Sequence, residues 1–155
     1  MFADFDAQYM EMAIAEARNA DRKGEVPVGA VIVIDGLVVA HTFNQPISTS
    51  DPTAHAEMLA LREAARTAGN YRLSAATMYC TLEPCMMCAG AMIHARIARL
   101  VFGALDPKAG SAGSIYNVLT DPRLNHRVDV VPGVRQAECS SLLRDFFSRR
   151  RRILE

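Results

Sequence analysis

The sequence has no net charge, no long apolar run and only four cysteines. Lysine and arginine together number 17, as do aspartate and glutamate, so the overall charge does not predict a polyanionic partner. Any nucleic acid must therefore be held by local clusters of basic residues. The chain contains no run of about eighteen apolar residues and no basic, apolar secretory signal at its start. We expect a cytoplasmic protein without a membrane partner.

The length of 155 residues lies within the usual range of one domain, and a hydrophobic content of 50% is sufficient for a real core. We expect residues 1–155 to form a single domain. Four cysteines in a reducing compartment are unsuited to a disulfide framework. Cys80 and Cys139 are expected to be buried apolar residues, whereas the close pair Cys85 and Cys88 favours metal or redox chemistry.

The order of periodic segments predicts an α/β protein. The expected elements are a helix at about 9–20, strands at 28–34 and 37–41, a helix at 53–67, a strand at 76–82, a helix at 85–94, strands at 97–102 and 128–131, and a helix from 136 to about 152. Asp6 is the expected cap of the first helix, and Asp35-Gly36 favours an antiparallel hairpin. The later strand, helix and strand predict a right-handed crossover and a parallel pair. Together these elements predict a three-layer α/β/α fold with a mixed central sheet of about five strands.

Two short segments thirty positions apart carry the most informative chemistry, His55-Ala56-Glu57 and Pro84-Cys85-Met86-Met87-Cys88. The two cysteines are expected on one face of the first turn of a helix, where free backbone N–H groups favour the thiolate. His55 is expected in the first turn of another helix, which disfavours imidazolium and keeps the neutral ring that a metal requires. One imidazole and two thiolates satisfy three corners of a tetrahedral zinc ion and leave the fourth to water, as in a catalytic site.

A fourth protein ligand would instead close the shell and make the zinc structural. His94 would point away from Cys85 on the same helix and is a poor candidate. His41 and His126 stay open as ligands from the sequence alone. A redox Cys-x-x-Cys pair is a further alternative, but it leaves the His-x-Glu segment without a role.

Glu57 is the carboxylate that the ligand set leaves free. Zinc lowers the pKa of bound water to about 7, but displacement of an amine also requires a group that carries protons. A carboxylate beside the metal can take the proton of water, give it to a ring nitrogen and later protonate the departing amine. The alternative is a solvent-facing acid that the helix dipole favours. We expect Glu57 to be catalytic.

The two segments resemble the zinc signature that several classes of base deaminase share. Longer segments resemble the bacterial tRNA-specific adenosine deaminases; in chain order they are Glu25-Val26-Pro27-Val28-Gly29-Ala30, residues 51–57, residues 81–94, Phe102-Gly103-Ala104 with Asp106 and Lys108, and Asn125-His126-Arg127-Val128. The resemblance implies a cytidine-deaminase-like fold, one Zn²⁺ per subunit and a homodimer. It also implies conversion of the wobble adenosine of a tRNA anticodon loop to inosine.

The same resemblance implies a pocket for the flipped base. Asn44 would read the purine, the backbone at Ala56 would contact its ring, and Val28 and Leu82 would line the pocket. The alternatives are that Val28 and Leu82 are core residues only, and that Asn44 stabilises a turn.

Three further positions would meet RNA outside this pocket. Asp106 and Lys108 would contact the ribose and phosphates near the flipped base, and Asn125 would lie close to neighbouring anticodon nucleotides. Asp106-Pro107 is also an ordinary opening of a turn, and that alternative stays open.

The last expected helix carries a basic run, Arg149 to Arg152, directly after two phenylalanines. Four arginines form a local patch suited to phosphates, and a nearby aromatic ring can stack on a base. We expect Phe147, Arg150 and Arg151 to contact RNA. Alternatively, this run is a solvated helix end that the dipole stabilises without a ligand.

The segment Met86 to Ile93 is apolar on nearly every side. One face can pack on the sheet, and the other must be covered or leave an exposed patch. A partner subunit is the expected cover, with the protein's own last helix as the alternative.

The sequence leaves two rival functions open. The first is a deaminase of a free base or nucleotide of the guanine or cytosine type, which would have a closed pocket. The second is a non-catalytic zinc module that binds RNA and releases no ammonia from any base.

Overall fold

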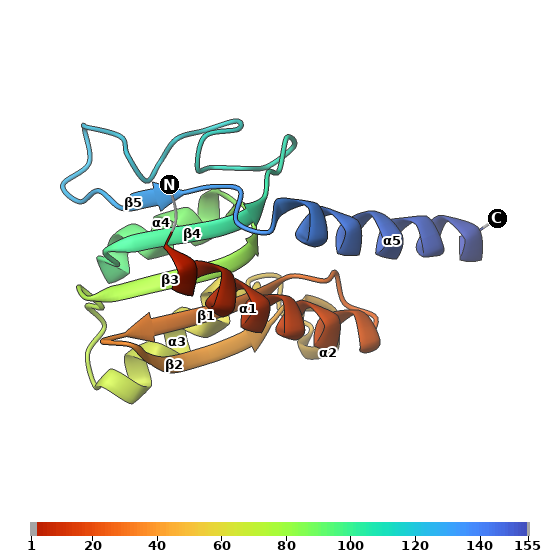
Figure 1. Ribbon diagram of the computed structural model, residues 1–155, viewed down its shortest axis with the longest axis horizontal. Coiled ribbons are helices and arrows are strands. Elements are labelled where there is room, and N and C mark those ends of the chain that lie inside the picture. Colours follow the sequence, from red (N-terminus) through yellow and green to blue (C-terminus); the bar gives the residue numbers. More distant parts are fainter. Residues whose placement is uncertain (1–2, 155) are drawn as a thin grey trace.

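The computed structural model describes residues 3–154. In these residues a five-stranded sheet lies between two layers of helices (Figure 1). In chain order the elements are α1 (Asp4–Arg22), β1 (Gly29–Ile34), β2 (Leu37–Phe43), α2 (Pro46–Thr49), α3 (Ala56–Ala68), β3 (Ala76–Leu82), α4 (Met86–Ala95), β4 (Arg99–Ala104), β5 (Asp129–Val131) and α5 (Gln136–Leu154). Helices α1 and α5 pack on one face of the sheet, and α3 and α4 lie on the other. The predicted three-layer α/β/α fold with a mixed sheet is confirmed.

The sheet has the strand order β2-β1-β3-β4-β5. The β1–β2 and β1–β3 pairs are antiparallel, whereas β3–β4 and β4–β5 are parallel. Asp35 and Gly36 have φ values of 50° and 75°, the positive angles that a tight hairpin turn requires. Both the predicted hairpin and the predicted parallel crossover are confirmed. Because β3 and β4 are parallel, Leu82 and Ala104 end side by side at one edge of the sheet, the usual place for a site in such folds.

Each face of the sheet has its own apolar core. The core under α3 and α4 includes Ile32, Met78, Leu100 and Phe102, and the core under α1 and α5 includes Val31, Tyr79 and Val101. This alternation follows from the two-residue period of a strand. Cys80 and Cys139 are both buried, as predicted for residues that act as small apolar side chains.

Helix α1 begins earlier than expected, and Asp6 is not its cap. The N-cap is Ala3, and Asp6 lies in the first turn, where its Oδ2 accepts the Ala3 N–H at 3.0 Å. Asp6 is fully buried because its carboxylate pairs with Arg99 of β4. The sequence pattern placed this acid at a helix end, but the ion pair with Arg99 draws it into the interior.

Helices α3 and α4 begin one to three residues later than predicted. His55 and Cys85 have extended backbone, with ψ of 148° and 176°, and they are the N-cap residues of α3 and α4. The segment between β2 and α3, for which no element was predicted, contains the short helix α2.

The outer face of α4 is not covered by the last helix. Helix α5 packs against β4 and α1, on the opposite face of the sheet (Figure 1). Met86 on α4 keeps 53% of its surface exposed. Among residues 3–154, no helix combines the length and apolarity that crossing a membrane requires.

Candidate active site

The three predicted metal ligands lie together. The Nδ1 atom of His55 is 3.5 Å from the Sγ atoms of both Cys85 and Cys88. All three donor atoms lie within 4.8 Å of one another. In a tetrahedral zinc site with Zn–N of about 2.0 Å and Zn–S of about 2.3 Å, neighbouring nitrogen and sulfur donors are about 3.5 Å apart. Both nitrogen–sulfur distances therefore match those of a tetrahedral Zn²⁺ site.

The ends of two helices bring the donors together. As N-caps, His55 and Cys85 accept the first helical hydrogen bonds, from Leu59 N–H at 3.0 Å and Ala89 N–H at 2.9 Å. Their side chains are thereby held at the two helix N-termini, next to the carboxyl end of β3. Cys88 lies in the first turn of α4 and is fully buried.

Hydrogen bonds within the cluster shift the pKa values of the two thiols in opposite directions. The pKa of Cys85 is lowered to about 4, because the Cys88 thiol donates to its sulfur and the His55 ring lies close by, while burial opposes the shift. The pKa of Cys88 is raised, because its proton is held by the Cys85 sulfur and its surroundings are buried. The pKa of His55 is raised, chiefly by its hydrogen bond with Cys85, and not lowered as expected at a helix N-terminus. The protein alone thus holds one thiolate, and metal binding must release the proton of the second thiol.

No fourth side chain joins the cluster among the residues that the structure describes. Nδ1 of His41 lies 3.1 Å from a Glu16 carboxylate oxygen, and Nε2 of His126 lies 2.8 Å from the Ile97 carbonyl oxygen. Both histidines that could have supplied a fourth zinc ligand therefore contact other groups, away from the cluster.

Glu57 is buried beside the ligands, with 4% of its surface exposed. Burial raises the pKa of this carboxyl above its ordinary value, although a backbone N–H and the nearby His55 favour the ionised form. Ideal helical geometry would separate residues 55 and 57 widely, but His55 precedes α3 and has extended backbone. Both side chains therefore reach the same cavity.

A cavity of about 240 Å³ is lined by His55 and Cys85 of the cluster and by most of the predicted base pocket. Its lining comprises Val26, Val28, Asn44, His55, Glu57, Leu82, Glu83, Cys85, Asp106 and Ala109. Ala56 is fully buried behind it, and its carbonyl accepts the hydroxyl of Thr42 at 2.7 Å. The structure thus brings together Val28, Asn44, Leu82 and Asp106, from four separate segments of the chain.

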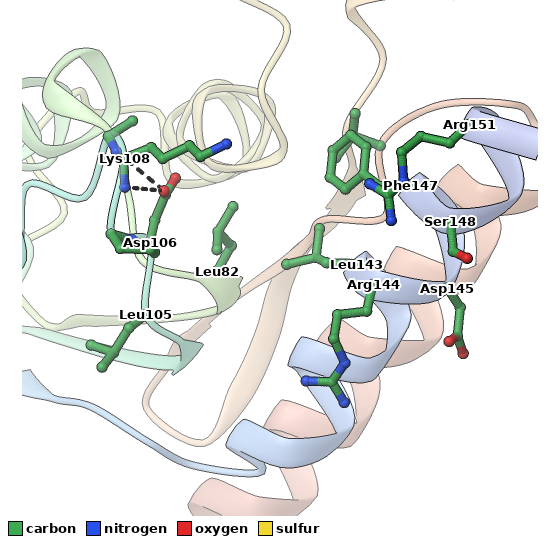
Figure 2. Close-up of a pocket in the computed structure, with 13 residues that line it drawn as sticks. Leu82, Leu105, Asp106, Lys108, Leu143, Arg144, Asp145, Phe147, Ser148 and Arg151 are labelled. Carbon is green, nitrogen blue, oxygen red and sulfur yellow. Dashed lines mark hydrogen bonds between the residues drawn. The ribbon is translucent and has the colours of Figure 1, made fainter. Parts of the chain in front are cut away.

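A larger groove of about 970 Å³ adjoins this cavity between α5 and the loop after β4 (Figure 2). Leu82, Asp106 and two further residues line both spaces. Figure 2 shows Phe147 and Arg151 of α5 across the groove from Asp106 and Lys108. The Asp106 carboxylate also accepts hydrogen bonds from the backbone N–H groups of Lys108 and Ala109. Asp106 therefore also stabilises a turn, the alternative role that the sequence left open.

Two of the predicted RNA contacts lie elsewhere. Arg150 donates to the carbonyl oxygen of Gly24 at 2.8 Å, and its guanidinium lies 5.0 Å from the centre of the Phe146 ring. Asn125 lines a separate cavity of about 490 Å³ beside α4, together with His94 and Ile93.

Sequence reasoning missed two buried carboxylates at this site, Glu25 and Glu83, each only 1% exposed. Burial opposes their ionisation, but hydrogen bonds from Ser48 and Ile47 lower the pKa of Glu25. Those from Ser114, Asp106 and Ala112 do the same for Glu83. The available signals were the position of Glu83 directly before the Pro84-Cys85 segment and that of Glu25 directly before the apolar segment that starts at Val26.

The model of the cytidine and deoxycytidylate deaminase zinc-binding region matches residues 3–104. The tRNA-specific adenosine deaminase of Bacillus subtilis (strain 168) is 49% identical over 142 residues, which cover 92% of this chain and 88% of that protein. The chain belongs to the tRNA-specific adenosine deaminase family. The Haemophilus influenzae member is 49% identical over 150 residues, which cover 96% of this chain and 87% of that protein.

Solved structures agree with this membership. A structure from a study of A-to-I editing by tRNA:A34 deaminases at the wobble position of transfer RNA matches with a TM-score of 0.85 and 44% identity, over 88% of this chain and 99% of that one. The guanine deaminase of Bacillus subtilis matches less well, with a TM-score of 0.63 and 37% identity over 68% of each chain. This member of the deaminase family therefore has the cytidine-deaminase-like fold, is a nucleobase deaminase and uses Zn²⁺ as its cofactor.

Proposed function

We propose that residues 1–155 act as one domain that converts the wobble adenosine of a tRNA anticodon loop to inosine, with one Zn²⁺ per subunit. The observation that carries the proposal is the His55, Cys85 and Cys88 cluster beside Glu57 in a cavity that adjoins a long groove. The relatives named tRNA-specific adenosine deaminase support the choice of substrate. A tRNA substrate and reduced zinc-binding thiols are both consistent with a cytoplasmic protein.

Glu57 is the proton carrier of the proposed reaction. When held by the three ligands, zinc supplies the Lewis acidity that makes water a nucleophile near neutral pH. Glu57 takes the proton of this water and delivers it to the adenine ring nitrogen next to the amino-bearing carbon, which becomes electrophilic. The hydroxide that remains adds to that carbon, and Glu57 then takes the proton of the new hydroxyl group and passes it to the amine. Ammonia leaves, and inosine remains.

The cavity wall would hold the flipped base. Asn44 offers an amide for the polar edge of the purine, and its burial makes an unpaired edge costly. Val28 and Leu82 offer apolar contact with the ring, and the backbone at Ala56 lies behind it. Base flipping into this cavity would leave the rest of the anticodon loop outside.

The groove offers the chemistry that RNA outside the pocket requires. Lys108 and Arg151 supply positive charge for phosphates, Phe147 supplies a ring for stacking, and Asp106 lies where both spaces meet. The proposed contacts of Arg150 and Asn125 are separate from the groove, because both residues lie outside its lining. A pocket for free bases would not need such an extension, which favours tRNA over a free base.

We also propose a homodimer in which a second copy covers α4. Met86 is 53% exposed, and Gly90 and Ile93 border an open cavity on this helix. Replacing Ile93 by Glu should convert a dimer to a monomer in sedimentation experiments, because a charge would be buried in the interface. Leu37→Glu on β2, at a position 69% exposed, is the matched control and should leave the mass unchanged. A monomeric unaltered protein would contradict the proposal.

The decisive experiment is inosine mapping in a tRNA pool treated with the purified, zinc-loaded protein. Free adenine, guanine and cytosine are assayed in parallel for ammonia. We expect inosine at the wobble position of a tRNA and little ammonia from any free base. Ammonia from guanine alone would support a guanine deaminase, the activity named for the Bacillus subtilis structural relative. No ammonia from any substrate would support a non-catalytic zinc module.

A further inference from the structure

Among residues 3–154, three carboxylates besides Glu57 are almost completely buried, namely Asp6, Glu25 and Glu83, with at most 1% of their surface exposed. Asp6 forms an ion pair with Arg99. Glu25 and Glu83 form no ion pair within the part of the chain that the structure describes. Buried charges of this kind require other partners. For Glu25 the partners are backbone N–H groups of α2, and for Glu83 they are backbone N–H groups and one hydroxyl of the loop 106–114.

Glu83 lies at the centre of the loop 106–114. Its carboxylate accepts the backbone N–H groups of Asp106, Ala112 and Ser114, each at 3.0 Å, and the hydroxyl of Ser114. Gly110 closes the loop over this carboxylate, and a Cβ atom there would lie 2.3 Å from the Glu83 Cδ atom. The two ends of the loop and its middle are thus fixed by one side chain.

The outer side of this loop faces the base cavity and the groove. Asp106 and Ala109 line the base cavity, and Lys108 lines the adjoining groove. The Asp106 carboxylate orders the turn in between by accepting the N–H groups of Lys108 and Ala109 at 3.0 and 3.1 Å. The position of this wall therefore follows from the hydrogen bonds of Glu83.

Glu25 holds the segment that follows Asn44. Its carboxylate accepts the backbone N–H groups of Ile47 at 3.1 Å and Ser48 at 2.7 Å, at the start of α2. Before this point, the backbone N–H of Asn44 donates to the Val28 carbonyl at 3.0 Å. Asn44 is consequently fixed between β1 on one side and the contact of Glu25 on the other.

We propose that Glu25 and Glu83 are positioning residues, one for each of two walls of the base cavity: Glu25 holds the wall that carries Asn44, and Glu83 holds the wall that carries Asp106. The proposal rests on the proposed function for its kinetic consequence only. A carboxylate suits this task because it accepts hydrogen bonds and donates none. Glutamine has the same shape, but its amide group would direct N–H donors at the N–H groups of the loop.

The first experiment is amide hydrogen exchange, which needs no substrate. In Glu83→Gln, the amides of Asp106, Ala112 and Ser114 should exchange at least about tenfold faster, while those of Ile47 and Ser48 stay unchanged. In Glu25→Gln, the reverse pattern is expected. Ser114→Ala removes one bond and is a milder variant that keeps the Glu83 test open should the glutamine variant not fold. Unchanged exchange at the named amides would overturn the proposal.

The second experiment is a pair of double-mutant cycles on deamination of an anticodon stem-loop RNA. Each single glutamine variant should lower kcat/KM by about tenfold to a hundredfold, since a shift of about 1 Å in a positioning group can cost about a hundredfold. If Glu83 acts through Asp106, its substitution should cost little more in an Asp106→Ala background. Glu83→Gln and Asn44→Ala should be additive within about twofold, because they affect different walls. Glu25→Gln should instead cost little more in an Asn44→Ala background and be additive with Asp106→Ala.

Asp6→Asn is the matched control, because Asp6 is an equally buried carboxylate on the opposite face of the sheet. It should reduce stability without altering either set of amides or either cycle. Zinc content is measured in every variant. Loss of zinc from Glu83→Gln would show that the substitution disturbs the neighbouring ligands. It would overturn the proposal that Glu83 acts by positioning the loop 106–114.

Additivity of Glu83→Gln with Asp106→Ala would overturn the positioning role even where exchange is faster. If the unaltered protein forms no inosine in any tRNA, the proposed function fails by itself. The exchange experiment then still decides whether the two carboxylates hold the walls.

Discussion

The two faces of the sheet treat buried charge in opposite ways. On the face that α1 covers, the carboxylate of Asp6, a residue of α1, accepts hydrogen bonds from the Tyr79 hydroxyl at 2.7 Å and from two Arg99 nitrogens at 2.8 and 2.6 Å. On the opposite face, Glu57 of α3 is also buried, but it forms no ion pair with any lysine or arginine of residues 3–154. One acid is neutralised by its surroundings, and the other is not.

The pKa values follow this difference. Burial raises the pKa of Asp6, but the bonds from Arg99 and Tyr79 outweigh it and lower the pKa below 3.8. At Glu57 burial prevails, and the pKa is raised above 4.5. A fully satisfied network stabilises one structure, whereas a buried group with an elevated pKa is suited to exchanging protons. The comparison therefore assigns stability to one face and chemistry to the other.

The largest effect is expected from removing a metal ligand. Cys85→Ala should abolish zinc binding and deamination together, because two donors leave the metal site open on two sides. Cys139→Ala is the matched control on the α1 face, where the thiol is buried and packs in the core. It should keep its zinc and its activity. Zinc is measured by atomic absorption, and full occupancy in Cys85→Ala would contradict the ligand assignment.

Glu57→Gln should retain zinc and lose turnover. Because the amide cannot carry protons, kcat should fall by at least about 10²-fold to 10⁴-fold. The measurements are inosine formation in single-turnover reactions and metal content of the same samples. Activity close to that of the unaltered protein would remove the proposed difference between the two faces.

Asp6→Asn should have the converse effect, a large loss of stability with little change in activity. Removing one partner of a buried ion pair costs about 3–5 kcal/mol, because Arg99 loses its counter-charge. Urea unfolding reports the stability, and kcat/KM for the tRNA substrate should stay within about twofold at temperatures where the variant is folded. A specific loss of activity in the folded variant would contradict the structural role of this network.

Acid unfolding sharpens the same comparison. The pKa of Asp6 is depressed below 3.8 in the folded protein, so its contribution to stability is present above that value. It is lost as the pH falls below 3.8 through the folded pKa. The difference in unfolding free energy between the unaltered protein and Asp6→Asn should therefore be constant at neutral pH and shrink in strong acid. A constant difference down to the acid limit would show that Asp6 is not ionised in the fold.

The sequence was informative where chemistry or turn geometry is local. Two short segments predicted the proposed zinc ligands and Glu57, whose side chains lie close together in the structure. The Asp35-Gly36 turn predicted the β1–β2 pair that the structure contains. Positions that depend on distant partners were not predictable. Asp6 was taken as a helix cap because its partner Arg99 lies 93 positions away. Glu25 and Glu83 received no role, because their partners are backbone groups of the short helix α2 and of the loop 106–114, whose paths the sequence pattern does not define.

The smallest predicted effect separates two arginines of α5, only one of which forms an ion pair within residues 3–154. Arg149 forms an exposed ion pair with Asp21 of α1 at 2.6 Å, whereas Arg151 lines the groove that adjoins the base cavity. Arg151→Ala should raise KM for an anticodon stem-loop by severalfold and reduce the salt dependence of binding by about one phosphate contact.

Arg149→Ala should change KM much less, because its charge is already balanced by Asp21, and an exposed pair of this kind contributes at most about 1 kcal/mol to stability. Both variants lose one positive charge from the same helix, so their net charges are identical. Binding measured between low and high salt therefore separates the effect of position from that of total charge. Equal losses in the two variants would show that RNA responds to the overall charge of the helix end and not to the groove.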